Sequence, residues 1–308
     1  MASVTIQDLQ GNPARQRKEA VVKAVLLVAA ALTVLITAGI VLALVGRAWE
    51  FISQVEFASL WSDDWAPRSN QFSIKTLLVA SLLVTGIAML IAAPIGLGAA
   101  IFLAEYASPR VRRTVKPVLE ILAGIPSVVL GFFALSFISP NIVERFFGTG
   151  GPTILAAGIG VGILTIPLIA SVSEDAMGSV PRALREASYG LGAKKITTTV
   201  KVVIPAAVSG LVASFILAIS RALGETMVVL LAAGAANAAQ FTTSPLDRGL
   251  TMTAAIASQI RGTEQARGAE GAELILPSLY FVGFALFVAT LFLNVVADRF
   301  VRRVRQKY

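Results

Sequence analysis

Arg221 and Glu225 are the residues whose types and spacing are best suited to chemistry in this sequence. Fifteen uncharged residues (206–220) precede Arg221, and 21 more (226–246) follow Glu225. A charge placed so deep in an apolar run is costly in a bilayer, so both side chains should face a bundle interior or a water-filled cavity. In a continuous helix the four-residue spacing would put them on one face, where they could pair.

Two interpretations of this pair remain open. A self-neutralising structural ion pair is one, although desolvation makes such a pair weak evidence for stability. A route for an anion is the other, because a guanidinium stays charged and its planar fork of donors matches phosphate oxygens. Glu225 could orient that fork or accept the proton of hydrogen phosphate, which sulfate lacks at neutral pH.

The elements that must position these residues are membrane helices. The chain has 308 residues, of which 56% are hydrophobic and 14% charged. Its apolar runs are continuous and long enough to cross a bilayer, and lack the alternation of a membrane β-barrel. We therefore predict an all-α, polytopic bundle of six spans: Ala24–Val45, Thr76–Leu103, Val118–Ile138, Thr153–Val172, Ala206 to about Ala235, and Ser278–Ala297.

Lysine and arginine counts predict the orientation of these spans. The two ends and alternate connections carry 18 of the 26 basic residues, the other connections carry seven, and Arg221 lies inside a span. The basic side is the cytoplasmic side. We expect a cytoplasmic segment at 1–23, a transmembrane permease domain at 24–297 with a cytoplasmic coupling region at 173–204, and a cytoplasmic basic tail at 298–308. Charges beside membrane ends argue against a nucleic-acid surface.

The coupling region should contain a short amphipathic helix. Ser179 could cap it, Pro181 fits its first turn, and Gly192 is suited to end it in a left-handed conformation. Two faces are expected, one with Leu184, Ala187 and Leu191 and the other with Arg182, Arg185 and Glu186. Such a helix could rest on lipid headgroups or dock a cytoplasmic partner, and the residues alone do not choose between them.

Within this region, Glu186-Ala187-Ser188, three residues, Gly192, nine residues and Val202-Val203-Ile204-Pro205 resemble the EAA signature of ABC-importer permeases. The resemblance implies a type I importer fold and a helix that fits a groove on an ATPase subunit. It assigns the ATPase-coupling role to Arg182, Arg185, Glu186, Ala187, Ser188, Gly192 and Pro205. The chain has no Gly-x4-Gly-Lys-Ser/Thr loop, so ATP and Mg²⁺ should be bound by that partner and this chain should be non-catalytic.

The segment Arg221-Ala222-Leu223-Gly224-Glu225-Thr226 is similar to Arg-Ala-x-Gly-Glu-Thr of phosphate-specific (Pst) transporter permeases. This resemblance adds Thr226 to Arg221 and Glu225 as a candidate residue of the substrate pathway. Met227 and the stretch Phe57–Pro67 resemble the PstC-type subunit. The resemblance implies import of inorganic phosphate by a heterodimer with a PstA-type permease, two copies of an ATPase and an external phosphate-binding protein. An importer of phosphonate, molybdate or sulfate, an ion-coupled carrier without an ATPase, and a membrane enzyme such as a lipid phosphatase are the alternatives.

Other residues carry smaller expectations. Gly158, Gly160 and Gly162 lie inside a span and should allow close helix packing. Pro94, Pro126 and Pro167 should kink their helices. The chain has no cysteine and no histidine, which excludes disulfides, a thiol nucleophile and zinc sites made of those residues. We therefore expect no metal and no cofactor in this chain.

Overall fold

The computed structural model describes residues 13–234, 238–263 and 272–304, and helices dominate them. Six helical runs in the described part are long and apolar enough to cross a membrane, in agreement with the predicted number. They are Arg17–Gln54, Ile74–Tyr106, Ser127–Phe147, Ile154–Gly178, Lys195–Leu223 and Glu273–Arg299. The chain is a multi-pass membrane protein. The orientation of its ends and the division at residues 23 and 297 stay predictions.

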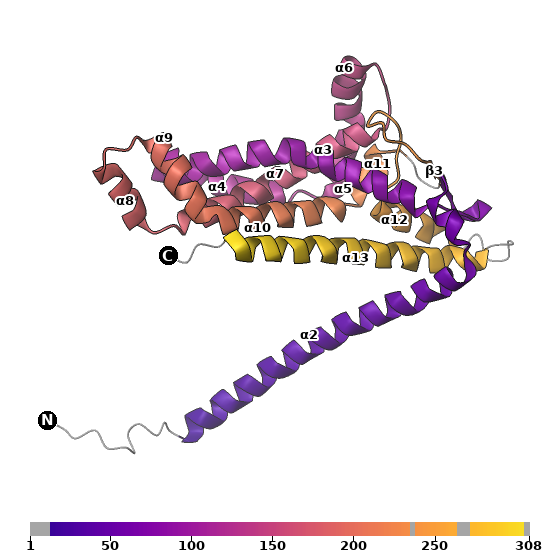
Figure 1. The fold of residues 1–308 in the computed structure, drawn as a ribbon, viewed down its shortest axis with the longest axis horizontal. Helices are drawn as coiled ribbons and strands as arrows, with labels where there is room; N and C mark the ends of the chain where they lie inside the picture. The colour runs from indigo at the N-terminus through magenta and orange to yellow at the C-terminus, as the bar shows by residue number, and fades with distance from the viewer. Residues whose placement is uncertain (1–12, 235–237, 264–271, 305–308) are drawn as a thin grey trace.

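The first and last helices meet at one end of the molecule. Helix α2 (Pro13–Gln54) diverges from the bundle over most of its length, whereas α13 (Ala272–Val304) lies along the bundle (Figure 1). Phe51 near the end of α2 is buried, and its ring lies 5.1 Å from that of Phe72 and 5.2 Å from that of Phe281. Val21 to Leu42 present exposed apolar side chains, as a helix in lipid would.

The centre of the bundle is the pair α3 (Ile74–Ile101) and α7 (Ile154–Gly178). Gly158 lies so close to α3 that a Cβ atom there would be 2.7 Å from the Ile87 side chain. A Cβ atom on Gly162 would lie 3.2 Å from the Ala88 carbonyl oxygen, and one on Gly160 would lie 2.9 Å from the Val228 side chain. The prediction that these glycines allow close packing is confirmed. Pro94 and Pro167 lie inside these two helices, which both continue through them.

A small antiparallel sheet covers one end of the bundle, and the sequence did not predict it. Its strands are β1 (Asp64–Ala66), β2 (Gln71–Phe72) and β3 (Ala239–Gln240), in the order β2-β1-β3. Short 3-10 helices, η1 (Phe57–Trp61) and η2 (Pro67–Ser69), flank β1. The sheet therefore joins two segments about 170 positions apart, and Trp65 pairs with both Phe72 and Ala239.

The predicted third span, Val118–Ile138, is wrong as a single helix. Helix α4 (Pro109–Ala123) ends at Gly124, and α5 (Ser127–Phe133) begins after Pro126. Pro126 is the residue before α5, so it lies inside no helix and kinks none. Its missing N–H costs nothing at a helix start. A π-helical segment, η4 (Ala134–Glu144), continues α5, with Ile138 and Val143 buried in the core. The short α6 (Arg145–Phe147) follows it and projects from the bundle (Figure 1).

The predicted fifth span, Ala206 to about Ala235, is also interrupted. The helical run begins with α9 (Lys195–Thr198), widens into the π-helical segment η5 (Thr199–Val203) and continues as α10 (Ile204–Leu223). It stops at Gly224, and α11 (Met227–Ala232) is a separate short helix. A further helix, α12 (Met252–Thr263), occupies a segment that we expected to be an outer connection, and several of its residues are buried.

Candidate functional site

The break between α10 and α11 places Arg221 and Glu225 on different elements. Arg221 lies in the last turn of α10, whereas Glu225 lies beyond its end. The prediction of one shared helix face is therefore wrong. Gly224 follows the last helical residue of α10, and glycine has the lowest helix propensity of all residues except proline. No ion pair joins Arg221 to Glu225 within the described residues.

Glu225 acts as the cap of α11. Its Oε1 accepts hydrogen bonds from the backbone N–H groups of Thr226 (3.1 Å), Met227 (3.1 Å) and Val228 (3.3 Å). These N–H groups have no partner inside the helix, and a carboxylate at a helix N-terminus also suits the helix dipole. The Glu225 carbonyl accepts a bond from the Thr253 hydroxyl at 2.8 Å, which ties the break to α12. Glu225 thus fixes the backbone of the break.

Arg221 remains exposed on the surface of the single chain. It has no hydrogen bond or ion pair to any residue that the structure describes. Its neighbour Ser220 bonds Asn294 of α13 at 3.2 Å, so the turn that carries the guanidinium is held in place. Thr226, the third predicted pathway residue, is half-buried, and its hydroxyl donates to the Gly224 carbonyl at 3.3 Å. The break therefore presents a positioned, unpaired cation.

The coupling region contains the predicted helix with shifted ends. Helix α8 spans Arg182–Gly190, and Gly192 adopts a φ of 79°, as predicted for the residue that ends it. Ser179 does not cap α8. It ends α7, and its hydroxyl donates to the Ala176 carbonyl at 2.7 Å, which leaves Pro181 directly before α8.

The two predicted groups of residues on α8 do not separate into a buried and an exposed set. Leu191, which we grouped with Leu184 and Ala187, is 90% exposed. Arg185, which we grouped with Arg182 and Glu186, is half-buried and pairs with Glu105 of the π-helical segment η3 (Phe102–Tyr106). Among the other predicted coupling residues, Ser188 bonds Thr198 at 2.8 Å, while Arg182, Glu186 and Ala187 are exposed. Pro205 lies in the first turn of α10.

A charged cluster that the sequence did not reveal joins α4 to α7. Glu174 of α7 has a side chain only 1% exposed and pairs with Arg112 and Lys116 of α4. Lys116 also pairs with Asp175. Burial lowers the pKa of Lys116, but its hydrogen bonds to Asp175 and Glu174 and their charges outweigh this and raise the pKa above its ordinary 10.5. The signal available in the sequence was the acidic residue Glu174 near the end of an otherwise apolar helix.

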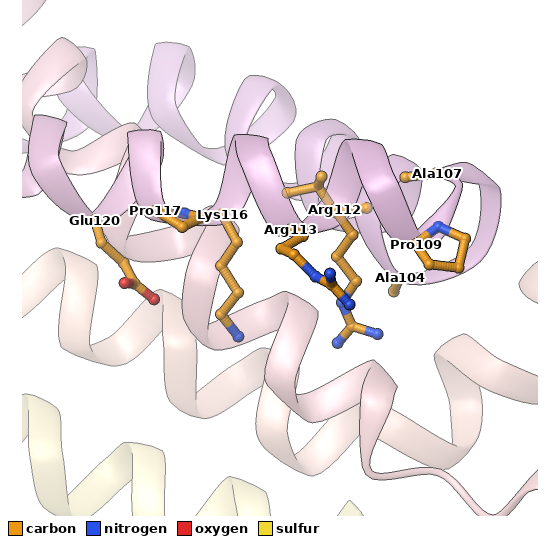
Figure 2. A pocket seen from close by; sticks show the side chains of 9 residues that line it. Ala104, Ala107, Pro109, Arg112, Arg113, Lys116, Pro117 and Glu120 are labelled. Carbon is orange, nitrogen blue, oxygen red and sulfur yellow. The ribbon is translucent and has the colours of Figure 1, made fainter.

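The same basic side chains line a groove of about 490 Å³ beside α4. Figure 2 shows the charged ends of Arg112, Arg113 and Lys116 on one side of this helix, with Glu120 further along. Acidic partners already neutralise Arg112 and Lys116. Within the residues described, no group of three or more acidic side chains is placed to hold a metal ion.

Comparisons with known proteins decide the family. Residues 92–308 match the model for the binding-protein-dependent transport system inner membrane component. The phosphate transport system permease protein PstC of Mesorhizobium japonicum is 33% identical over 295 residues, which cover 90% of this chain and 88% of that protein. This chain belongs to the PstC family of transport permeases. PstC of Pasteurella multocida is similar to the permease at 31% identity, over 89% of this chain and 88% of that protein.

Solved structures bear out the fold of the permease. A bacterial alginate ABC transporter, solved with an alginate-bound periplasmic protein, has a chain that superposes with a TM-score of 0.63. The match covers 94% of this chain and 97% of the other at 14% identity, so it speaks for the fold alone. The ABC-importer permease architecture expected from the EAA-like spacing is thus confirmed.

Proposed function

We propose that the permease is the membrane subunit of an ATP-driven importer that carries inorganic phosphate across the cytoplasmic membrane. The observation that carries this proposal is the unpaired guanidinium of Arg221, held at the end of α10 beside a capped helix break. The similarity to PstC proteins of two species supports phosphate as the cargo. Phosphonate, molybdate or sulfate would be the cargo under the alternative reading.

The depth of Arg221 makes an anion its natural partner. At 1.5 Å per residue it lies about 25 Å along α10 from Ile204, too far from the helix start for its side chain to reach water there. An exposed charge at such depth must meet a polar cavity or another subunit. Its own chain supplies no acidic partner among the described residues. A dianionic phosphate that passes Arg221 would receive two parallel hydrogen bonds from the fork.

Glu225 and Thr226 then serve the pathway indirectly. The Glu225 carboxylate is occupied by three backbone N–H groups. We therefore assign it to holding the break open beside Arg221, in place of the proton-accepting role considered from the sequence. The Thr226 side chain is half-buried next to it and keeps a hydroxyl oxygen that can accept a bond from the proton of hydrogen phosphate.

The partners in this proposal follow from the exposed surfaces and the family. Helix α8 and the following turn present Arg182, Glu186 and Leu191 to solvent, and we assign this surface to an ATPase subunit. The full importer would contain a PstA-type permease as heterodimer partner, two ATPase copies and an external phosphate-binding protein. Both ends of the chain would be cytoplasmic. ATP and Mg²⁺ would be bound by the ATPase, and the permease itself would be non-catalytic.

Phosphate-stimulated ATP hydrolysis by the purified complex in proteoliposomes tests this function. Wild type should respond to phosphate in the presence of the binding protein, and Arg221→Ala should lose at least tenfold of that response, because a charged hydrogen bond contributes about 1.5–3 kcal/mol. Arg113→Ala removes an exposed arginine of α4 and is the matched control. A response to sulfate or molybdate but not to phosphate would show that phosphate is not the cargo and that the other anion is. A full response in Arg221→Ala would remove that residue from the pathway.

A further inference from the structure

The side chain of Arg185 joins three elements at the base of α8. Its Nε and Nη2 donate to Oε1 of Glu105 at 3.1 and 2.8 Å. Its Nη1 donates to the Val180 carbonyl at 2.7 Å and its Nη2 to the Met177 carbonyl at 2.8 Å. Met177 belongs to the last turn of α7, Val180 to the link before α8, and Glu105 to η3. One guanidinium therefore fastens α8 to the ends of both α7 and α3.

The burial of this pair contrasts with the rest of α8. The Glu105 side chain is 3% exposed and that of Arg185 is 17% exposed, whereas α8 contains no fully buried residue. A fork that donates to two backbone carbonyls and a buried carboxylate together has little freedom to move. Leu184 packs beside it against the apolar cluster around Met177 and Val203. A displacement of α8 must therefore move its neighbours or break these bonds.

The receiving element, η3, is a single π-helical turn at the end of α3. Such turns occur frequently at functional sites, because they shift the helix register by one residue. The turn is held from two sides of the coupling region. Glu105 contacts α8 through Arg185, and the next residue, Tyr106, has the Nζ of Lys195 of α9 4.9 Å from its ring centroid. Both sides of the α8–α9 loop thus hold the same turn of α3.

From η3 the contacts continue to the helix break. Helices α3 and α7 are locked by close glycine contacts, including Gly96 against Ile169, where a Cβ would lie 2.8 Å from the side chain. At its other end α7 contacts α11 through Gly160 and Val228, and Val228 donates to the Glu225 cap. A rigid pair of helices therefore connects Glu105 to the residues around Arg221.

We propose that the Arg185–Glu105 pair is the positioning link through which movement of α8 is transmitted to α3 and α7. This inference rests on the proposed function, in which an ATPase grips α8. Arg185 acts inside the permease, and the outer face of α8 makes the contact with the ATPase. The other described side-chain hydrogen bond of α8, between Ser188 and Thr198, leads to α9, and the packing of Leu184 is apolar and lacks the fixed direction of the Arg185 bonds.

The first test separates coupling from assembly. Glu105→Gln and Arg185→Lys should retain the co-purifying ATPase and its ATP hydrolysis, while phosphate moved per ATP falls by roughly 2- to 30-fold, the range that coupling energies in such networks correspond to. The double variant should lose no more than the stronger single variant, because both remove one interaction. Arg110→Gln, an exposed arginine of α4, is the control and should match wild type. An unchanged ratio in Glu105→Gln, with an importing wild type, would overturn the link.

A second test does not depend on the substrate. The chain has no cysteine, so spin labels can be placed at Gly190→Cys in α8 and Gly98→Cys in α3, where added side chains meet open space. In the complete complex the distance between the labels should stay constant when ATP is added to the wild-type background. In Glu105→Gln it should shift or broaden. An equal ATP-driven shift in both backgrounds would disprove the link, whereas absent phosphate import with a constant wild-type distance would disprove only the proposed function.

Discussion

Lys116 of α4 and Glu174 of α7 are joined by a contact of 2.7 Å between Nζ and Oε2, although 58 positions separate them in the sequence. The same carboxylate also pairs with Arg112, so two cations of one helix meet a single buried anion of another. Because α4 has no fully buried residue, this carboxylate is a principal anchor of α4 to the bundle.

Replacement of Glu174 by alanine should destabilise the permease. The loss of a buried partner costs about 3–5 kcal/mol where the charge left behind is itself buried, and the loss here should be smaller, because Arg112 and Lys116 are 43% and 27% exposed and Lys116 keeps Asp175. Asp175→Asn is the matched control, since its side chain is 62% exposed and such pairs contribute about 0–1 kcal/mol. Thermal unfolding of the complex in detergent checks both variants. Equal losses in the two would show that burial does not decide the strength of this cluster.

The raised pKa of Lys116 gives a pH dependence in the alkaline range. Because the folded pKa lies above the ordinary 10.5, the stabilisation by its charge is fully present below pH 10.5 and is lost as pH rises through the folded pKa. Stability should therefore be insensitive to this group at neutral pH and should fall above pH 10.5. Lys116→Arg stays charged there and should lessen the fall. Unfolding temperatures of wild type and Lys116→Arg, measured from about pH 8 to about pH 11.5, check this. Equal falls in the two proteins would contradict it.

The sequence predicted the features that depend on local patterns. Six apolar runs followed from helix length, and the positive φ of Gly192 just beyond the end of α8 followed from the preference of glycine for this conformation. The break after Leu223 did not follow, because apolar residues flank it on both sides and no proline marks it. Pro126 was a usable signal for the start of α5, and we read it as a kink inside a span.

The charge pairs could not be predicted because they depend on tertiary contacts. Glu105 with Arg185, and Glu174 with Lys116, are 80 and 58 positions apart and lie on helices whose relative rotation the sequence does not specify. For the same reason the sequence did not indicate that Arg185 pairs with a buried carboxylate while Leu191 is exposed. The sheet was missed for the same reason, since β3 is a two-residue strand that forms only against β1.

The close approach of α3 and α7 predicts opposite effects at two glycines. Gly158→Ala would place a Cβ 2.7 Å from Ile87, on a branched side chain that cannot retreat, and overpacking of this kind costs about 1–3 kcal/mol. Gly98→Ala meets nothing within 4 Å and should be neutral or slightly stabilising, since alanine favours helix. Thermal unfolding of both variants makes the comparison. An unaffected Gly158→Ala would mean that the two helices separate easily.

The cap formed by Glu225 predicts that two substitutions of this residue differ. Glu225→Ala removes the acceptor for three N–H groups and should cost about 0.5–2 kcal/mol, as other cap deletions do. Glu225→Gln keeps a side-chain oxygen in place of Oε1, so it should retain most of the stability and, if Glu225 only shapes the break, most of the phosphate uptake. Thermal unfolding and uptake by the same proteoliposomes separate the two roles. A stable Glu225→Gln complex without uptake would show instead that the carboxylate charge itself is needed along the path beside Arg221.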